Sequence, residues 1–220
     1  MKLEDIDYFL LKKNQQPAVY ELAQRTVDES RKDSADTVEI ERRLQLLTRS
    51  SGTEHIRQCS NFLAEAMAFN ALLDASHVPH WVPETTYSTP DLCYRSSSDA
   101  VAVEVKHLNS PREEHEALAS GHTYGRSVDM NYDAGLQQKI EDFVASARRK
   151  FKKFNEIEND RSSDESGELY LYFSRSLDAS LTDGISWMRT MKQRVTGIAT
   201  PLCGTDITLI VTDIDEQFNS

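Results

Sequence analysis

The sequence VAVEVK, at residues 101–106, decides which fold to expect for this chain. Successive side chains of a strand point to opposite faces, so the three valines lie on one face and Ala102, Glu104 and Lys106 on the other. A carboxylate and an ammonium group on a strand this rich in valine must reach solvent, pair with each other, or serve a site that needs both. The stretch therefore predicts an apolar strand that carries two opposite charges on one face.

A second strand-like run, residues 91–94, lies upstream and begins at Pro90-Asp91. The residues between the two runs, 95–99, are Arg-Ser-Ser-Ser-Asp, a composition typical of a hairpin turn. Such a hairpin brings Asp91 close to Glu104 in space.

A helix is predicted upstream, over residues 53–75. Its apolar stripe consists of Ile56, Cys59, Phe62, Leu63, Ala66, Phe69, Leu72 and Leu73. Glu65 falls within this stripe. Two interpretations are open: Glu65 lies at a solvated edge of the helix, or it is a carboxylate directed at an internal polar site.

The remaining pattern predicts an α/β fold, with a mixed central sheet flanked by helices and a helical N-terminal extension. Further strands are expected at residues 81–87, 169–173 and 207–211, and further helices at residues 136–154 and 184–195. A long polar connection covers residues 109–135. We expect residues 1–50 to form the helical extension and residues 51–220 the main domain.

The predicted helix at residues 136–154 ends in a dense basic run that includes Arg148, Arg149 and Lys150. Positive charges stabilise a helix C-terminus, which is one interpretation. The other is a nucleic-acid contact, since no other run in this acidic chain is as basic.

Composition narrows the classes of function. With 36 acidic and 25 basic residues the net charge is -11, which argues against general electrostatic coating of nucleic acid but leaves room for a local basic groove. Three scattered cysteines favour free thiols, and no signal peptide or membrane span is evident, so we expect a cytoplasmic protein without membrane contact. His77 and His80 have a two-histidine spacing, but the intervening proline favours a strand-entry loop over a metal site.

Two carboxylates and a lysine on neighbouring strands match what phosphodiester hydrolysis requires: a hard cation held by oxygens, a water beside it, and positive charge near the developing oxyanion. Asp91, Glu104 and the backbone carbonyl of Val105 are the candidate Mg²⁺ ligands. Lys106 is the candidate residue that positions or helps to deprotonate the water, or stabilises the pentavalent phosphate.

At these residues the chain resembles the PD-(D/E)XK nuclease superfamily, also called restriction-endonuclease-like. The resemblance is carried by Pro90-Asp91 and by Glu104-Val105-Lys106, and residues 53–173 follow the family's αβββαβ order. It implies that Glu65 matches a helix glutamate that serves as an outer or second-metal carboxylate. A further family residue on the next helix has Gln137, Gln138 and Lys139 as possible matches.

The first hypothesis is a Mg²⁺-dependent nuclease acting on DNA, with Mn²⁺ able to substitute for Mg²⁺. Its catalytic residues would be Asp91, Glu104, Lys106 and Glu65. Its nucleic-acid contacts would come from Gln138, Lys139, Arg148, Arg149 and Lys150. The alternative is a non-catalytic nuclease-like module in a defence or repair complex. A separate interpretation of the motif is that Glu104 and Lys106 form only an exposed ion pair on one face of the strand. The N-terminal helices are candidates for contact with a second copy or a partner protein.

Overall fold

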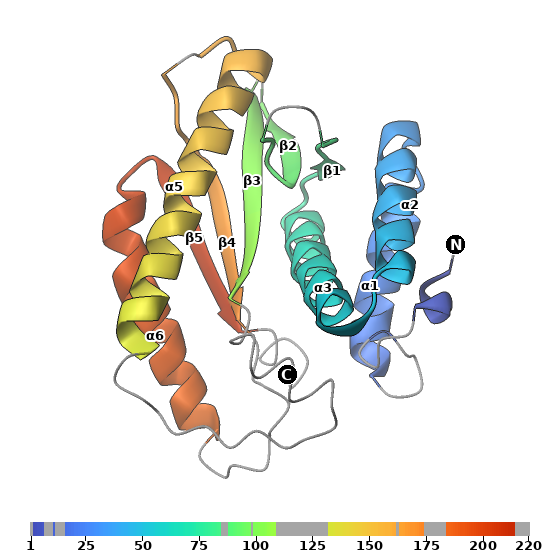
Figure 1. Ribbon diagram of the computed structural model, residues 1–220. Helices are drawn as coiled ribbons and strands as arrows, with labels where there is room; N and C mark the ends of the chain where they lie inside the picture. Colours follow the sequence, from blue (N-terminus) through green and yellow to red (C-terminus); the bar gives the residue numbers. More distant parts are fainter. Residues whose placement is uncertain are drawn as a thin grey trace.

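The protein is an α/β structure in which a mixed sheet lies between two layers of helices (Figure 1). The computed structural model describes residues 2–6, 11, 16–84, 88–97, 99–108, 132–161, 163–173 and 184–213. Within these residues the predicted order from the long helix onward is observed: helix, three strands, helix, strand, helix, strand.

The described sheet has five strands in the order β1-β2-β3-β4-β5. Their bounds are β1 His80–Trp81, β2 Leu92–Ser96, β3 Asp99–Leu108, β4 Gly167–Phe173 and β5 Ile207–Asp213. The first three strands pair antiparallel, whereas β3, β4 and β5 are parallel. Because parallel neighbours need a crossover, a helix precedes β4 and another precedes β5.

Helices occupy both sides of the sheet (Figure 1). A 3-10 turn and five α-helices are described: η1 Leu3–Asp5, α1 Pro17–Ser30, α2 Ser34–Arg49, α3 Gly52–Asp74, α5 Tyr132–Glu158 and α6 Gly184–Cys203. Asp33 caps α2 by accepting hydrogen bonds from the backbone amides of Ala35 (2.8 Å) and Asp36 (3.2 Å).

Alternation along β3 separates two apolar clusters. Val103 and Val105 belong to the cluster that contains α1, α2 and α3, whereas Ala102 belongs to the cluster that contains α5 and α6. The predicted division of β3 into two faces is therefore confirmed. The predicted boundary near residue 50 falls between α2 and α3, and α1 and α2 share one core with α3 and the sheet.

The predicted hairpin is also observed. Leu92 pairs with Val103 and Tyr94 with Val101, while Ser97 in the connection has a positive φ of 58°. The backbone amide of Asp91 donates to the Val103 carbonyl at 3.1 Å. Asp91 therefore lies immediately before β2, directly beside the charged part of β3.

Three predicted elements differ clearly from the observed ones, one of them the helix expected at residues 184–195, which continues to Cys203 as α6. The strand expected at residues 81–87 is only the two-residue β1, because Pro83 lacks the amide needed to extend the ladder; residues 85–87 lie outside the described residues. The helix expected at residues 136–154 runs from Tyr132 to Glu158, and its last turn contains no basic residue. The connection predicted at residues 109–135 falls largely outside the described residues.

Gly167 shows how closely α5 packs on the sheet. A Cβ atom at this position would lie 2.8 Å from Cγ of Phe151 and 2.9 Å from the Ala102 carbonyl oxygen. Only a residue without a side chain fits where β4 begins between β3 and α5.

Candidate functional site

Glu104 is the central buried charge of the candidate site. Its side chain is 0% exposed and lies in the middle of β3. Both carboxylate oxygens accept hydrogen bonds from Nζ of Lys150 on α5, at 2.7 and 2.8 Å. Oε1 also pairs with Nζ of Lys106, two residues along the same strand. Glu104 and Lys106 therefore form an ion pair on one face of β3. This pair is largely buried, and Lys150 is a second cation bound to the same carboxylate.

Asp91 lies on the neighbouring strand at the same level. Its Oδ2 accepts a hydrogen bond from the backbone amide of Val105 at 2.8 Å. This bond fixes one carboxylate oxygen against the main chain between Glu104 and Lys106. The structure therefore brings together the Asp91, Glu104 and Lys106 that the sequence pattern singled out.

Glu65 approaches the same region from α3. Phe62 and Phe69, one turn away on either side, are buried, and the Glu65 side chain is only 14% exposed. Its Oε2 pairs with Nη1 of Arg43 on α2. Glu65 is therefore directed at an internal polar site and does not lie at a solvated edge of the helix.

The pKa values of the carboxyl groups show that negative charge is crowded here. Burial raises the pKa of Glu104 to about 7, with a further contribution from Asp91, and the two contacting lysines offset only part of this. Burial likewise raises the pKa of Glu65 to about 6, opposed by Arg43 and reinforced by Asp91. The two glutamates therefore each interact electrostatically with Asp91, which lies between the α3 side and the α5 side of the site.

Lys106 has a different balance. Burial lowers the pKa of its ammonium group, but the carboxylates of Glu104 and Asp91 outweigh burial and the net shift is upward. Lys106 is consequently a cation at neutral pH. In this arrangement it can donate hydrogen bonds and supply positive charge, but it cannot accept a proton.

Sequence reasoning missed Arg43 and assigned Lys150 to another role. Arg43 follows Ile40 by three positions, so it borders the buried stripe of α2, a signal that points inward. Lys150 likewise follows a buried residue of its helix, Ala147 on α5, by three positions. It is Lys150, and not Gln138 or Lys139, that contacts Glu104. Lys150 lies about three turns further along the helix than Lys139.

The other residues predicted to contact nucleic acid have separate environments on α5. Gln138 is exposed and bonds to Asp142 at 3.1 Å, and the Lys139 ammonium lies 5.8 Å from the Phe143 ring centroid. Arg148 donates to the Leu202 and Cys203 carbonyls at 2.8 and 2.9 Å, where it caps the end of α6.

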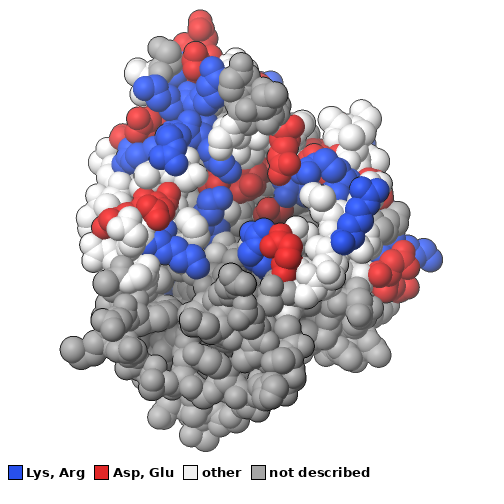
Figure 2. Space-filling model, in the orientation of Figure 1, with Lys and Arg blue, Asp and Glu red and all other residues white. Residues whose placement is uncertain are grey.

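Arg149 and Lys152 are exposed, and Figure 2 shows Lys and Arg gathered over the C-terminal half of α5. Because α5 continues to Glu158, this basic surface does not mark the helix end, and stabilisation of a helix terminus does not explain it. Arg149 and Lys152 therefore form an exposed basic surface on the helix whose Lys150 contacts Glu104.

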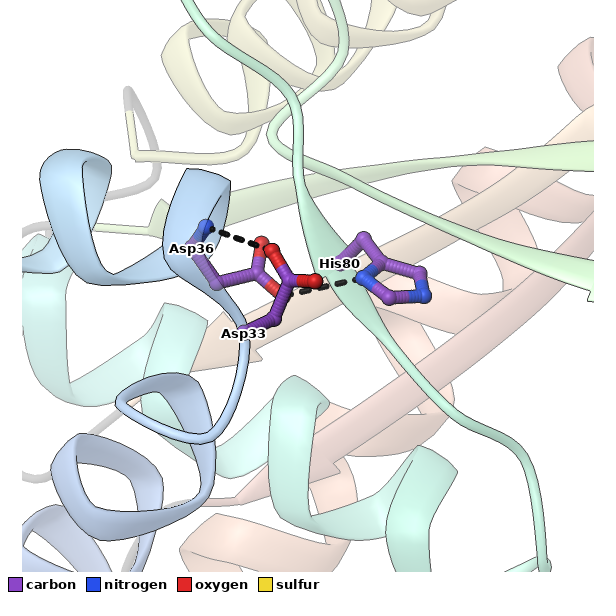
Figure 3. A group of neighbouring side chains, drawn as sticks. All are labelled: Asp33, Asp36 and His80. Atoms are coloured by element: carbon purple, nitrogen blue, oxygen red, sulfur yellow. Dashed lines mark hydrogen bonds and ion pairs between the residues drawn. The ribbon is translucent and has the colours of Figure 1, made fainter.

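A second group of potential ligands lies away from this site, around His80 (Figure 3). Among the described residues, only Asp33, Asp36 and His80 form a group of three acidic or histidine side chains with ligand atoms within 4.8 Å of one another. Asp36 accepts from the Trp81 backbone amide at 2.8 Å and contacts His80 Nδ1 at 2.9 Å. Asp33 caps α2, so these contacts anchor β1 to the helix and account for the whole group.

Comparison of the chain with protein-family models, curated proteins and solved structures finds no match. In the part of the chain that the structure describes, no helix is both long enough and apolar enough to cross a bilayer. What the site does must therefore be argued from its own residues.

Proposed function

We propose that this protein is a metal-dependent nuclease of the PD-(D/E)XK type that hydrolyses phosphodiester bonds of DNA. One observation carries the proposal: the Asp91 carboxylate is bonded to the Val105 amide, directly between Glu104 and Lys106. An acid-x-lysine strand next to an aspartate on the adjoining strand is the arrangement on which the resemblance depends. The α, β, β, β, α, β order of the described elements is consistent with it.

The donor chemistry fits a hard divalent cation such as Mg²⁺. Asp91 and Glu104, with the Val105 carbonyl, offer only oxygen ligands, which Mg²⁺ and Mn²⁺ prefer. The raised pKa of Glu104 means that ionising this buried carboxyl is costly, and an added cation offsets that cost. When bound, such a cation lowers the pKa of a coordinated water and stabilises charge on the phosphate.

The protein residues have distinct roles in the proposed reaction. Water attacks phosphorus and its oxygen stays on the new phosphomonoester. The P–O bond to the leaving group breaks, and the leaving alkoxide takes up one proton while a second passes to solution. Lys106, held as a cation by Glu104 and Asp91, orients the water and stabilises the charge of the pentavalent phosphate. Glu65 supplies an additional carboxylate from the α3 side.

The substrate is inferred from the charges around the site. A polyanion must approach a chain of net charge -11, so it needs a local basic surface. Arg149 and Lys152 provide one on α5, the helix that also carries Lys150 to Glu104. The proposed path of the DNA backbone runs along this helix.

The test is a panel of linear, circular and single-stranded DNA and of RNA, incubated with Mg²⁺ or Mn²⁺. Wild type should cleave DNA, EDTA should abolish cleavage, and Asp91→Asn should lose it while melting at a similar temperature. Arg95→Met, an exposed residue on β2 beyond the site, is the matched control and should cleave at the wild-type rate. Absence of cleavage of every substrate with either metal would refute the proposal.

One observation favours the alternative of a non-catalytic binding module. The three acids Glu65, Asp91 and Glu104 are matched in number by Arg43, Lys106 and Lys150, so ion pairs already offset much of the negative charge without a further ion. Replacing such a network by apolar residues is often energetically neutral, so the network is consistent with a structural role as well as with catalysis. Calorimetry separates the two functions: the module predicts no Mg²⁺ or Mn²⁺ binding that depends on Asp91.

A further inference from the structure

Arg43 connects the N-terminal helices to the candidate site. It extends from α2, its side chain is only 12% exposed, and its Nη1 pairs with Oε2 of Glu65 on α3. Its Nε donates to Oε1 of Glu39 at 3.0 Å, one turn earlier on α2. The guanidinium carbon also lies 4.4 Å from the centroid of the Trp81 ring. The Arg43 side chain is therefore held by two carboxylates, those of Glu65 and Glu39, and by the face of the Trp81 ring.

These contacts require arginine in particular. A planar guanidinium can bond two carboxylates along different edges while its face stacks on an indole ring. A lysine ammonium could pair with Glu65, but it could not hold Glu39 and cover Trp81 in the same way. The carboxylate of Glu65 is thereby held at the end of a rigid chain that runs from Glu39 through Arg43.

Arg43 also interacts electrostatically with Asp91, one of the candidate metal ligands. Burial lowers the pKa of its guanidinium, but the carboxylates of Glu65, Asp91 and Glu39 together outweigh burial and the net shift is upward. Arg43 therefore remains charged, and the Glu65 carboxylate keeps its partner.

We propose that Arg43 is a positioning residue of the catalytic site, which holds the Glu65 carboxylate in place on α3, so that α2 is a working part of the nuclease rather than an appendage. This inference rests on the proposed nuclease function. It goes beyond that function because it assigns a role to a helix outside the αβββαβ core and to a residue outside the acid-x-lysine pattern.

Arg42 provides a matched control. It precedes Arg43 on the same helix and pairs with the same Glu39 carboxylate at 2.6 Å, but it also pairs with Glu84, at 3.2 Å, and not with Glu65. Its side chain is 35% exposed. If Arg42→Met and Arg43→Met both slow DNA cleavage, the cause is a weaker attachment of α2. If only Arg43→Met slows cleavage, the cause is the lost contact with the Glu65 carboxylate.

The test measures single-turnover DNA cleavage as a function of Mg²⁺ concentration, at a temperature where each variant is folded by circular dichroism. Arg43→Met should cleave about 10- to 100-fold more slowly, as expected when the partner of a metal-site carboxylate is lost, and should need more Mg²⁺ for half-maximal rate. Arg43→Lys should recover part of the rate, and Arg42→Met should stay within about twofold of wild type. If Arg43→Met does not fold, the cleavage rates of Arg43→Lys and Arg42→Met are compared instead. A slower rate for Arg43→Lys supports the positioning role, and equal rates contradict it.

A double-mutant cycle separates positioning from general stabilisation. In the Glu65→Gln background, Arg43→Met should lower the rate by less than about twofold, because the carboxylate that it positions is gone. An equal fold-loss in both backgrounds, or wild-type cleavage by Arg43→Met, would overturn the assignment of Arg43 and leave the nuclease proposal intact. A wild type that cleaves nothing overturns both.

Discussion

Glu104→Gln should remove a pH dependence of folding stability that this one carboxyl group creates. In the folded protein, burial and the nearby Asp91 raise the pKa of Glu104 from 4.5 to about 7. Between those values the folded state binds more protons than the unfolded state, so the stability is full below pH 4.5 and is lost as the pH rises toward 7. The shift of 7 − 4.5 = 2.5 pH units corresponds to about 3 kcal/mol at 1.36 kcal/mol per unit.

The assay is urea unfolding of wild type and Glu104→Gln between pH 4.5 and 8, in EDTA. The free energy of unfolding of wild type minus that of the variant should fall by about 3 kcal/mol across this range, because a glutamine does not titrate. Contributions from all other groups cancel to first order in the difference.

Glu54→Gln is the control for this comparison. Glu54 lies on the surface of α3, and the hydrogen bond from Arg57 lowers its pKa, so any pH dependence that it creates runs in the opposite direction and below pH 4.5. A wild-type-minus-Glu104→Gln difference that stays constant within about 1 kcal/mol, or that grows with pH, would refute the reasoning. It would mean that Lys106 and Lys150 keep Glu104 ionised.

Three further predictions concern separate parts of the molecule. Calorimetry should find Mg²⁺ binding about tenfold weaker at pH 6 than at pH 8, because Glu104 must lose a proton; equal affinity would contradict its role as a ligand. Gly167→Ala should destabilise the fold by about 1–3 kcal/mol in urea unfolding, because the new Cβ would overlap Phe151; an unchanged midpoint would contradict the close packing. Arg148→Met should lower the melting temperature by removing the cap of α6, whereas Arg149→Met should melt like wild type but bind DNA more weakly in fluorescence anisotropy; the reverse pattern would refute these assignments.

Local pattern was sufficient to predict the hairpin and the two faces of β3. Alternation depends only on strand geometry, so Glu104 and Lys106 could be placed on one face from the sequence, and a polar turn of suitable length then implied the position of Asp91. Glu65 could be narrowed to two interpretations, because helical periodicity shows which residues share a stripe but not how deeply the stripe is covered.

The partners of these acids could not be predicted, because they depend on long-range packing. Arg43 on α2 reaches Glu65 on α3, and Lys150 reaches Glu104 from α5, the helix that connects β3 to β4. The length of α5 was also underestimated, since a basic run looks like a helix end although the helix continues to Glu158. Likewise, the pairing of His80 with Asp36 depends on how β1 packs against α2.

Lys106 and the acids beside it are proposed to hydrolyse phosphodiester bonds. The most direct measurement is the single-turnover rate of DNA cleavage at saturating Mg²⁺ for wild type and for Lys106→Met, compared at pH 8 with equal amounts of folded protein. Wild type should cleave, and the variant should be at least about 100-fold slower, because Lys106 is proposed to be the cation that stabilises the transition state. Equal rates for the two proteins would contradict this role.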